Sequence, residues 1–108
     1  MIKQEQLASF LSGIFGADKV TYYDFGDKDK APNPPFVAYL FDGSYKVDAD
    51  NKTYFREDSY RIELYVKRTD YQSEKLLEMA FDDDDIPYTK LDKILNEDTQ
   101  LFEVIYTI

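Results

Sequence analysis

The sequence predicts an α+β fold in which two helices pack on a mixed, mostly antiparallel sheet. Apolar residues recur with helical spacing over 4–15 and again after residue 72, whereas residues 59–67 alternate between apolar and polar as a strand does. A long polar segment lies between two strand-like runs, 36–41 and 59–67. The expected order is helix, strand, strand, long hairpin, strand, helix, strand, strand. A chain of 108 residues is expected to form one domain, 1–108.

The first helix is predicted over residues 4–15. Its apolar stripe has i, i+3, i+4, i+7 spacing, which is typical of an amphipathic helix with one face on a core: Leu7, Phe10, Leu11 and Ile14. Gly16 follows where a C-terminal cap is expected. Residues 20–25 are rich in strand formers and predict a short strand.

The next strand is expected to begin at Phe36, because Pro34 and Pro35 cannot donate hydrogen bonds to a sheet. Its run to Phe41 is apolar on both alternating faces, which is typical of a strand covered on both sides. In so small a domain, a neighbouring subunit is a candidate for the second cover. The dipeptide Asp42-Gly43 is expected to form a turn.

Residues 44–58 are too polar for a core strand and predict an extended hairpin with Asp50-Asn51 at its tip. Exposed Tyr and Phe residues on a protruding hairpin are typical anchors of protein–protein contacts. The alternative, that they pack back on their own sheet, is equally open. The hypothesised partner or oligomer interface is Tyr45, Val47, Asp50, Asn51, Tyr54 and Phe55.

The second half of the chain predicts a strand, a helix and two further strands. The sequence Thr69-x-x-Gln72 fits a capping box that opens the helix. Its expected apolar face is Leu76, Leu77, Ala80 and Phe81. The helix is expected to end near residues 82–85, with strands over 88–95 and 101–108.

The formal net charge of −9 makes electrostatic binding of nucleic acid improbable, since phosphate binding needs clustered Lys and Arg. An acidic surface fits a passage through which DNA slides without sticking, although solubility alone also accounts for it. The candidate lining residues are Asp48, Asp50, Asp82, Asp83, Asp84 and Asp85. No apolar run is long enough to span a bilayer, so we expect a soluble chain made in the cytoplasm.

Catalysis and cofactor binding are not expected. The chain has no Cys and no His, which removes thiolate chemistry, the commonest general base and the commonest zinc ligand. A calcium loop that begins at Asp82 would need a glycine at its sixth position, where the sequence has Pro87. The sequence therefore predicts neither an enzyme nor a metal or cofactor site.

Several segments, in their order and spacing, resemble the tail terminator or tail completion proteins of long-tailed phages of Gram-positive bacteria. These segments are Pro34-Pro35-Phe36-Val37-Ala38-Tyr39-Leu40, Ala49-Asp50-Asn51-Lys52-Thr53-Tyr54, Tyr60-Arg61-Ile62-Glu63-Leu64-Tyr65 and the ending from Phe102 to Ile108. Pro87-Tyr88-Thr89-Lys90 also matches in position. The resemblance covers nearly the whole chain.

The resemblance implies a structural protein of the virion and no catalytic residues. It implies a homohexameric ring that ends the tail tube and docks the head, so that the tail tube protein and a head connector or stopper protein are its partners. DNA would pass through the lumen without specific binding, and no membrane is involved. Two alternatives stay open: another ring of the neck, such as an adaptor or stopper, and a monomeric acidic inhibitor that mimics DNA.

Overall fold

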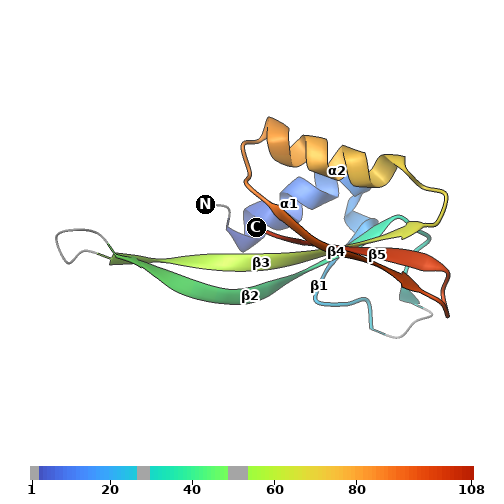
Figure 1. The fold of residues 1–108 in the computed structure, drawn as a ribbon, viewed down its shortest axis with the longest axis horizontal. Helices are drawn as coiled ribbons and strands as arrows, with labels where there is room; N and C mark the ends of the chain where they lie inside the picture. The colour runs from blue at the N-terminus through green and yellow to red at the C-terminus, as the bar shows by residue number, and fades with distance from the viewer. Residues whose placement is uncertain (1–2, 27–29, 49–53) are drawn as a thin grey trace.

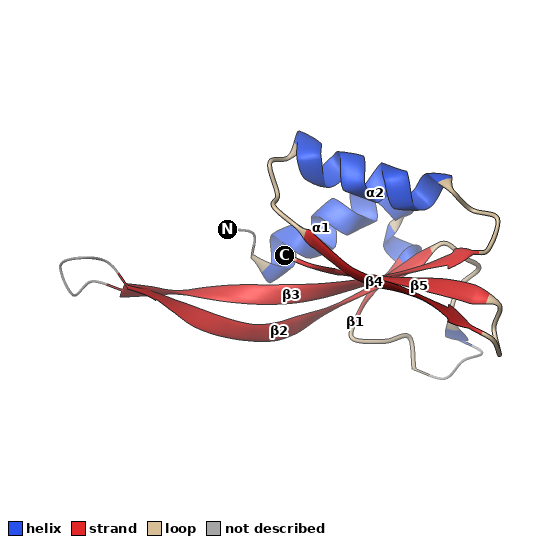
Figure 2. Ribbon diagram, in the orientation of Figure 1, coloured by secondary structure: helices blue, strands red, loops and turns tan. Residues whose placement is uncertain are grey.

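Two helices lie on one face of a five-stranded sheet in the computed structural model, which describes residues 3–26, 30–48 and 54–108 (Figures 1 and 2). In chain order the elements are α1 (Gln4–Phe15), a short 3-10 helix η1 (Ala17–Lys19), β1 (Val20–Tyr22), β2 (Phe36–Asp48), β3 (Tyr54–Lys67), α2 (Gln72–Asp83), β4 (Thr89–Asn96) and β5 (Leu101–Thr107). The predicted α+β class and the order of the elements are confirmed.

The sheet has the strand order β1-β2-β3-β5-β4. Only β1 and β2 are parallel, and the other three pairs are antiparallel, so the sheet is mixed and mostly antiparallel as predicted. β4 and β5 are joined by a tight turn, and β4 is the edge strand on that side of the sheet. β2 and β3 are the longest strands and extend well past the helical layer (Figure 1).

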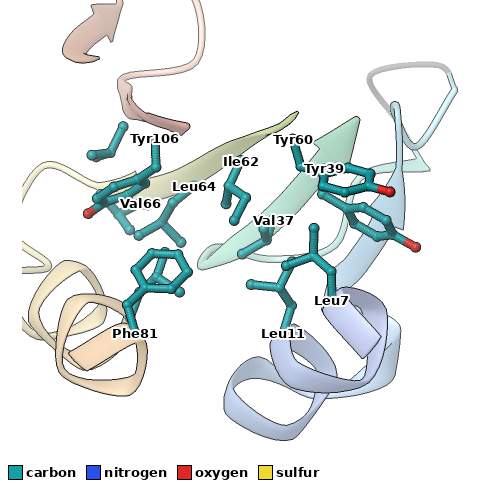
Figure 3. Close-up of a cluster of buried hydrophobic side chains, with 12 residues drawn as sticks. Leu7, Leu11, Val37, Tyr39, Tyr60, Ile62, Leu64, Val66, Phe81 and Tyr106 are labelled. Carbon is teal, nitrogen blue, oxygen red and sulfur yellow. The ribbon is translucent and has the colours of Figure 1, made fainter. Parts of the chain in front are cut away.

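The core lies between the helices and the sheet (Figure 3). Each helix supplies two fully buried side chains, Leu7 and Leu11 from α1 and Leu77 and Phe81 from α2. Alternate residues of the central strands meet them, as the strand period of two requires. These sheet residues are Val37, Tyr39, Tyr60, Ile62, Leu64, Val66, Val104 and Tyr106.

The opposite face of the sheet is covered in part by the chain's own aromatic side chains. Phe36 and Ala38 are buried there although no helix lies over them. The ring of Phe25 meets Phe36 edge-on at 5.5 Å, and Tyr65 stacks on Phe36 at 4.9 Å. The predicted second cover of β2 is therefore supplied in part from within the chain.

Two predictions about β-structure were wrong. Asp42-Gly43 does not turn the chain, because β2 continues to Asp48 and the register with β3 shifts between Phe41 and Ser44. Gly43 has φ 101°, a conformation that serves a β-bulge as well as a turn. The strand predicted over 20–25 ends at Tyr22.

Two predictions about α2 were also wrong. Leu76 does not join the core, since its side chain is 50% exposed. The helix is capped by Asp70 and not by a Thr69–Gln72 box. The Asp70 carboxylate accepts 3.0 Å hydrogen bonds from the backbone N–H groups of Gln72 and Ser73, and a third from the Ser73 hydroxyl at 2.6 Å. A carboxylate can satisfy several free amides at once, which explains why it caps the helix.

Candidate functional site

The outer part of the β2–β3 hairpin forms a two-stranded arm, which we define as residues 44–48 and 54–58. Ser44 pairs with Asp58 at its root and Asp48 with Tyr54 at its far end. β1 pairs only with residues 37–39 of β2. β5 and the Ile108 that follows it bond β3 no further out than Ser59, since the Tyr60 backbone exchanges hydrogen bonds with Ile108 and the Ser59 hydroxyl donates to the Ile108 carbonyl. Within the described part of the chain, both edges of the arm are therefore free of a third strand (Figure 2).

An arm of this kind is a physical reason to look for a partner. An isolated two-stranded hairpin is at best marginally stable in water, and free strand edges present unpaired N–H and C=O groups. The arm projects away from the helices and the rest of the sheet (Figure 1), and the molecule measures 52 × 28 × 24 Å. The predicted extended hairpin is thus present in its two strands.

Four of the hypothesised interface residues lie on the two strands of the arm. In the backbone register of the arm, Val47 pairs with Phe55 and Tyr45 with Glu57. Tyr54 pairs with Asp48 at the far end of the arm. The predicted tip, Asp50-Asn51, lies outside the described residues.

Exposed aromatic residues also lie where the arm leaves the body, a surface that sequence reasoning missed. Phe41 is 45% exposed and meets Tyr60 edge-on at 6.3 Å, and Tyr22, 43% exposed, meets Tyr39 at 5.3 Å. We call these two exposed rings and their two buried partners, Tyr39 and Tyr60, the aromatic root. The register pairs of β1 with β2 and of β2 with β3 place all four on one face, and those pairings are not visible in the sequence.

The acidic residues proposed as a DNA-facing lining lie in two separate places. Asp48 ends β2 at the far end of the arm, whereas Asp82–Asp85 lie at the C-terminal end of α2 above the body (Figure 1). Asp50 lies outside the described residues. The structure thus does not gather these acids into one patch.

The end of α2 does border an open groove of about 930 Å³ between the two helices. Its lining includes the apolar residues Phe10 and Ile86 and the acidic residues Glu5 and Asp83–Asp85, of which Asp83–Asp85 are exposed. Carboxylates at a helix C-terminus oppose the negative end of the helix dipole. The groove is consequently an electronegative surface with some apolar area.

A separate charged cluster fastens α2 to the sheet. Glu78 accepts a 2.7 Å hydrogen bond from the buried Tyr106 hydroxyl and a 3.0 Å bond from Lys90. Glu74 accepts bonds from Lys90 and, at 2.9 Å, from Lys93. Burial opposes ionisation of Glu74, but these two lysines outweigh it and hold the pKa of that carboxyl below its ordinary value. We assign this cluster to stability, because each of its charges has a partner.

Two further observations bear on function. In the parts of the chain that the structure describes, no three acidic side chains converge as a metal site would require. No helix of the described residues is long and apolar enough to cross a membrane.

The sequence matches no protein-family model, and no curated protein is similar enough to count as a relative. The resemblance to tail terminator proteins therefore rests on the segments of the sequence named above.

Proposed function

We propose that this chain is a subunit of a ring at the head–tail junction of a long-tailed phage, where it ends the tail tube and docks the head. The observation that carries the proposal is the arm, with two free edges and an aromatic root, on a body of two helices and a five-stranded sheet. Such an arm on a small structural domain is suited to contact with a neighbour.

The mechanism is assembly through unlike surfaces. The arm of one subunit contacts a different surface of the next subunit or of the tube end, and such a head-to-tail contact closes into a ring when the rotation fits. Burial of the arm would pair its free edges and remove the Phe41 and Tyr22 rings from water. A homohexamer is the ring that the resemblance implies.

The net charge of −9 supports the passage of DNA without binding, because like charge repels the phosphate backbone. Asp48 on the arm and Asp82–Asp85 beside the groove are the candidate lining residues. Lysine substitutions at Asp83 and Asp84 should slow DNA ejection from assembled particles. Unchanged ejection kinetics would count against a lumen position for that corner.

A second candidate function is favoured by the acidic groove. Its exposed carboxylates and apolar lining residues suit a basic protein surface, as expected of a monomeric acidic inhibitor or DNA mimic. Against it, Lys and Arg are interleaved with the acids along most of the chain.

Negative-stain electron microscopy of the purified protein, with its mass measured by light scattering over a wide concentration range, tests the proposal. Rings with six-fold symmetry support it. Capture assays against tail tube protein and head connector protein then separate a terminator from an adaptor or stopper. A monomer that binds neither protein, but binds a basic nuclease tightly, would favour the inhibitor.

A further inference from the structure

The face of the sheet turned away from the helices carries two carboxyl groups on adjacent strands. Glu63 of β3 pairs in register with Ile105 of β5, and Glu103 of β5 pairs with Tyr65 of β3. The two glutamates are thus diagonal cross-strand neighbours on one face, within reach of each other's side chains. The residues on either side of Glu63, Ile62 and Leu64, belong to the core on the opposite face.

The surroundings of Glu63 are poorly hydrated. Its side chain is only 16% exposed, although no helix covers this face. Ala38 of β2 lies opposite it in the register on one side and Ile105 on the other, and both are buried. A carboxylate in such a setting is costly unless it is paired or neutralised.

The cationic side chains near Glu63 and Glu103 are fewer than the acidic side chains on the same face. The Arg61 guanidinium lies 3.4 Å from the Glu63 carboxyl, and its Nε is buried without a hydrogen-bond partner. The same face also carries Asp92 of β4, opposite Ile105, and Lys67 of β3, two residues beyond Tyr65. Tyr65 lies opposite Glu103 in the register. Arg61 is thus paired with Glu63, and Lys67 lies further along the same face.

Two carboxylates that share a poorly hydrated site repel each other when both are ionised. Because ionised carboxylates only accept hydrogen bonds, a hydrogen bond between the two side chains would require a proton on one of them. We propose that Glu63 and Glu103 share a proton and form a pH-sensitive contact between β3 and β5, which is stabilising while the proton is held and repulsive once it is lost. Without the proton, two like charges lie next to each other on this face of the sheet.

The electrostatics of the site support this pH-sensitive contact. Burial raises the pKa of Glu63 to about 7, and the hydrogen bond and charge of Glu103 act in the same direction, whereas Arg61 acts in the opposite one. The folded pKa thus exceeds the ordinary value of 4.5. The stabilisation from the held proton is complete below that ordinary value and is lost as pH rises through about 7. This inference does not depend on ring formation.

The direct test is a carbon-13 NMR titration of the glutamate side-chain carboxyls between pH 3 and 9. The chain has no histidine, so no ordinary side chain titrates near pH 7. Glu63 should titrate with a midpoint near 7. In Glu103→Gln, the Glu63 midpoint should fall by about one pH unit or more, because the like charge is gone. A purely packing role for Glu103 would not move the Glu63 midpoint in this way.

Denaturant unfolding at several pH values gives an independent readout. Between pH 5 and 7 the unfolding constant of the wild type should rise by up to about tenfold per pH unit. Glu63→Gln, which keeps a hydrogen-bond donor and cannot ionise, should lack that dependence. Glu97→Gln, a charge-matched change in the exposed turn between β4 and β5, should retain it. A wild-type Glu63 midpoint near 4.5, or a Glu63→Gln profile with the wild-type pH slope, would overturn the inference.

Discussion

The hydroxyl group of Tyr106 donates a 2.7 Å hydrogen bond to the carboxylate of Glu78, which links β5 in the centre of the core to α2 above it. Tyr106 is fully buried, so its hydroxyl has no access to bulk water. Burial, with the nearby Glu78 charge, raises the pKa of that hydroxyl.

Removal of this hydroxyl by Tyr106→Phe should lower the free energy of unfolding by about 1.5–3 kcal/mol, the usual value of a hydrogen bond to a charged group. Urea denaturation at neutral pH measures the loss. Tyr88→Phe is the matched control, because the Tyr88 hydroxyl is 3.4 Å from the same carboxylate and should contribute much less. Equal losses of unfolding free energy in the two variants would show that the 2.7 Å hydrogen bond stabilises the protein no more than the 3.4 Å contact does.

Adjacent leucines of α2 should respond very differently to truncation. Leu77 is fully buried and Leu76 is 50% exposed. Leu77→Ala should cost about 2–5 kcal/mol through lost burial and a cavity, whereas Leu76→Ala should change stability by less than about 0.5 kcal/mol. Thermal and urea unfolding of the two variants measure this contrast. A large loss of unfolding free energy in Leu76→Ala would contradict the prediction, since it would mean that the Leu76 side chain makes a stabilising contact that the structure does not show.

The two ends of α2 should respond oppositely to the loss of a carboxylate. Asp70 caps the N-terminus. Burial opposes its ionisation, but the hydrogen bonds from Ser73 and Gln72 prevail and hold the pKa of Asp70 below its ordinary value. Asp70→Ala should therefore cost about 0.5–2 kcal/mol. The contribution of Asp70 is present above its ordinary pKa and is lost as pH falls through the depressed folded value.

At the other end, Asp83→Asn should stabilise the protein by about 0.3–1 kcal/mol at low salt, because it removes a negative charge from the negative end of the helix dipole. Urea denaturation at low and high salt measures the effect, which salt should reduce. A loss of stability in Asp83→Asn would indicate that this carboxylate has a favourable partner.

The periodic signals predicted most of the fold. The stripe of Leu7 and Leu11 and the alternation of Ile62, Leu64 and Val66 each mark one buried face, because period and burial are local properties of a segment. Leu76 was misplaced because it lies next to Leu77 in an apolar pattern, and the sequence does not show which side of that pattern the sheet will cover.

The proposed functional surfaces depend on the register between paired strands, which the sequence of a single strand does not determine. In the sequence, Glu63 is one of several polar residues on one face of a predicted strand. Only the pairing of β3 with β5 brings Glu103 beside it. The aromatic root likewise needs β1, β2 and β3 in register. The dipeptide Asp42-Gly43 predicts a turn, but the positive φ that Gly43 adopts serves a β-bulge equally well.

The central claim is that the arm makes this chain assemble. Its most direct test is the particle mass, by light scattering with and without tail tube protein, of the wild type and of a variant in which Asn-Gly replaces residues 45–57. A second variant, in which Asn-Gly replaces only residues 49–53, keeps both strands of the arm and separates their role from that of the tip. Circular dichroism and thermal unfolding confirm that each variant is folded.

We predict that the wild type forms particles of the mass of a six-fold ring, alone or on the tube end. The variant without the arm should fold with its core intact and remain a monomer under both conditions. A folded variant that assembles as the wild type does, or a wild type that stays monomeric with the tube protein present, would contradict the account.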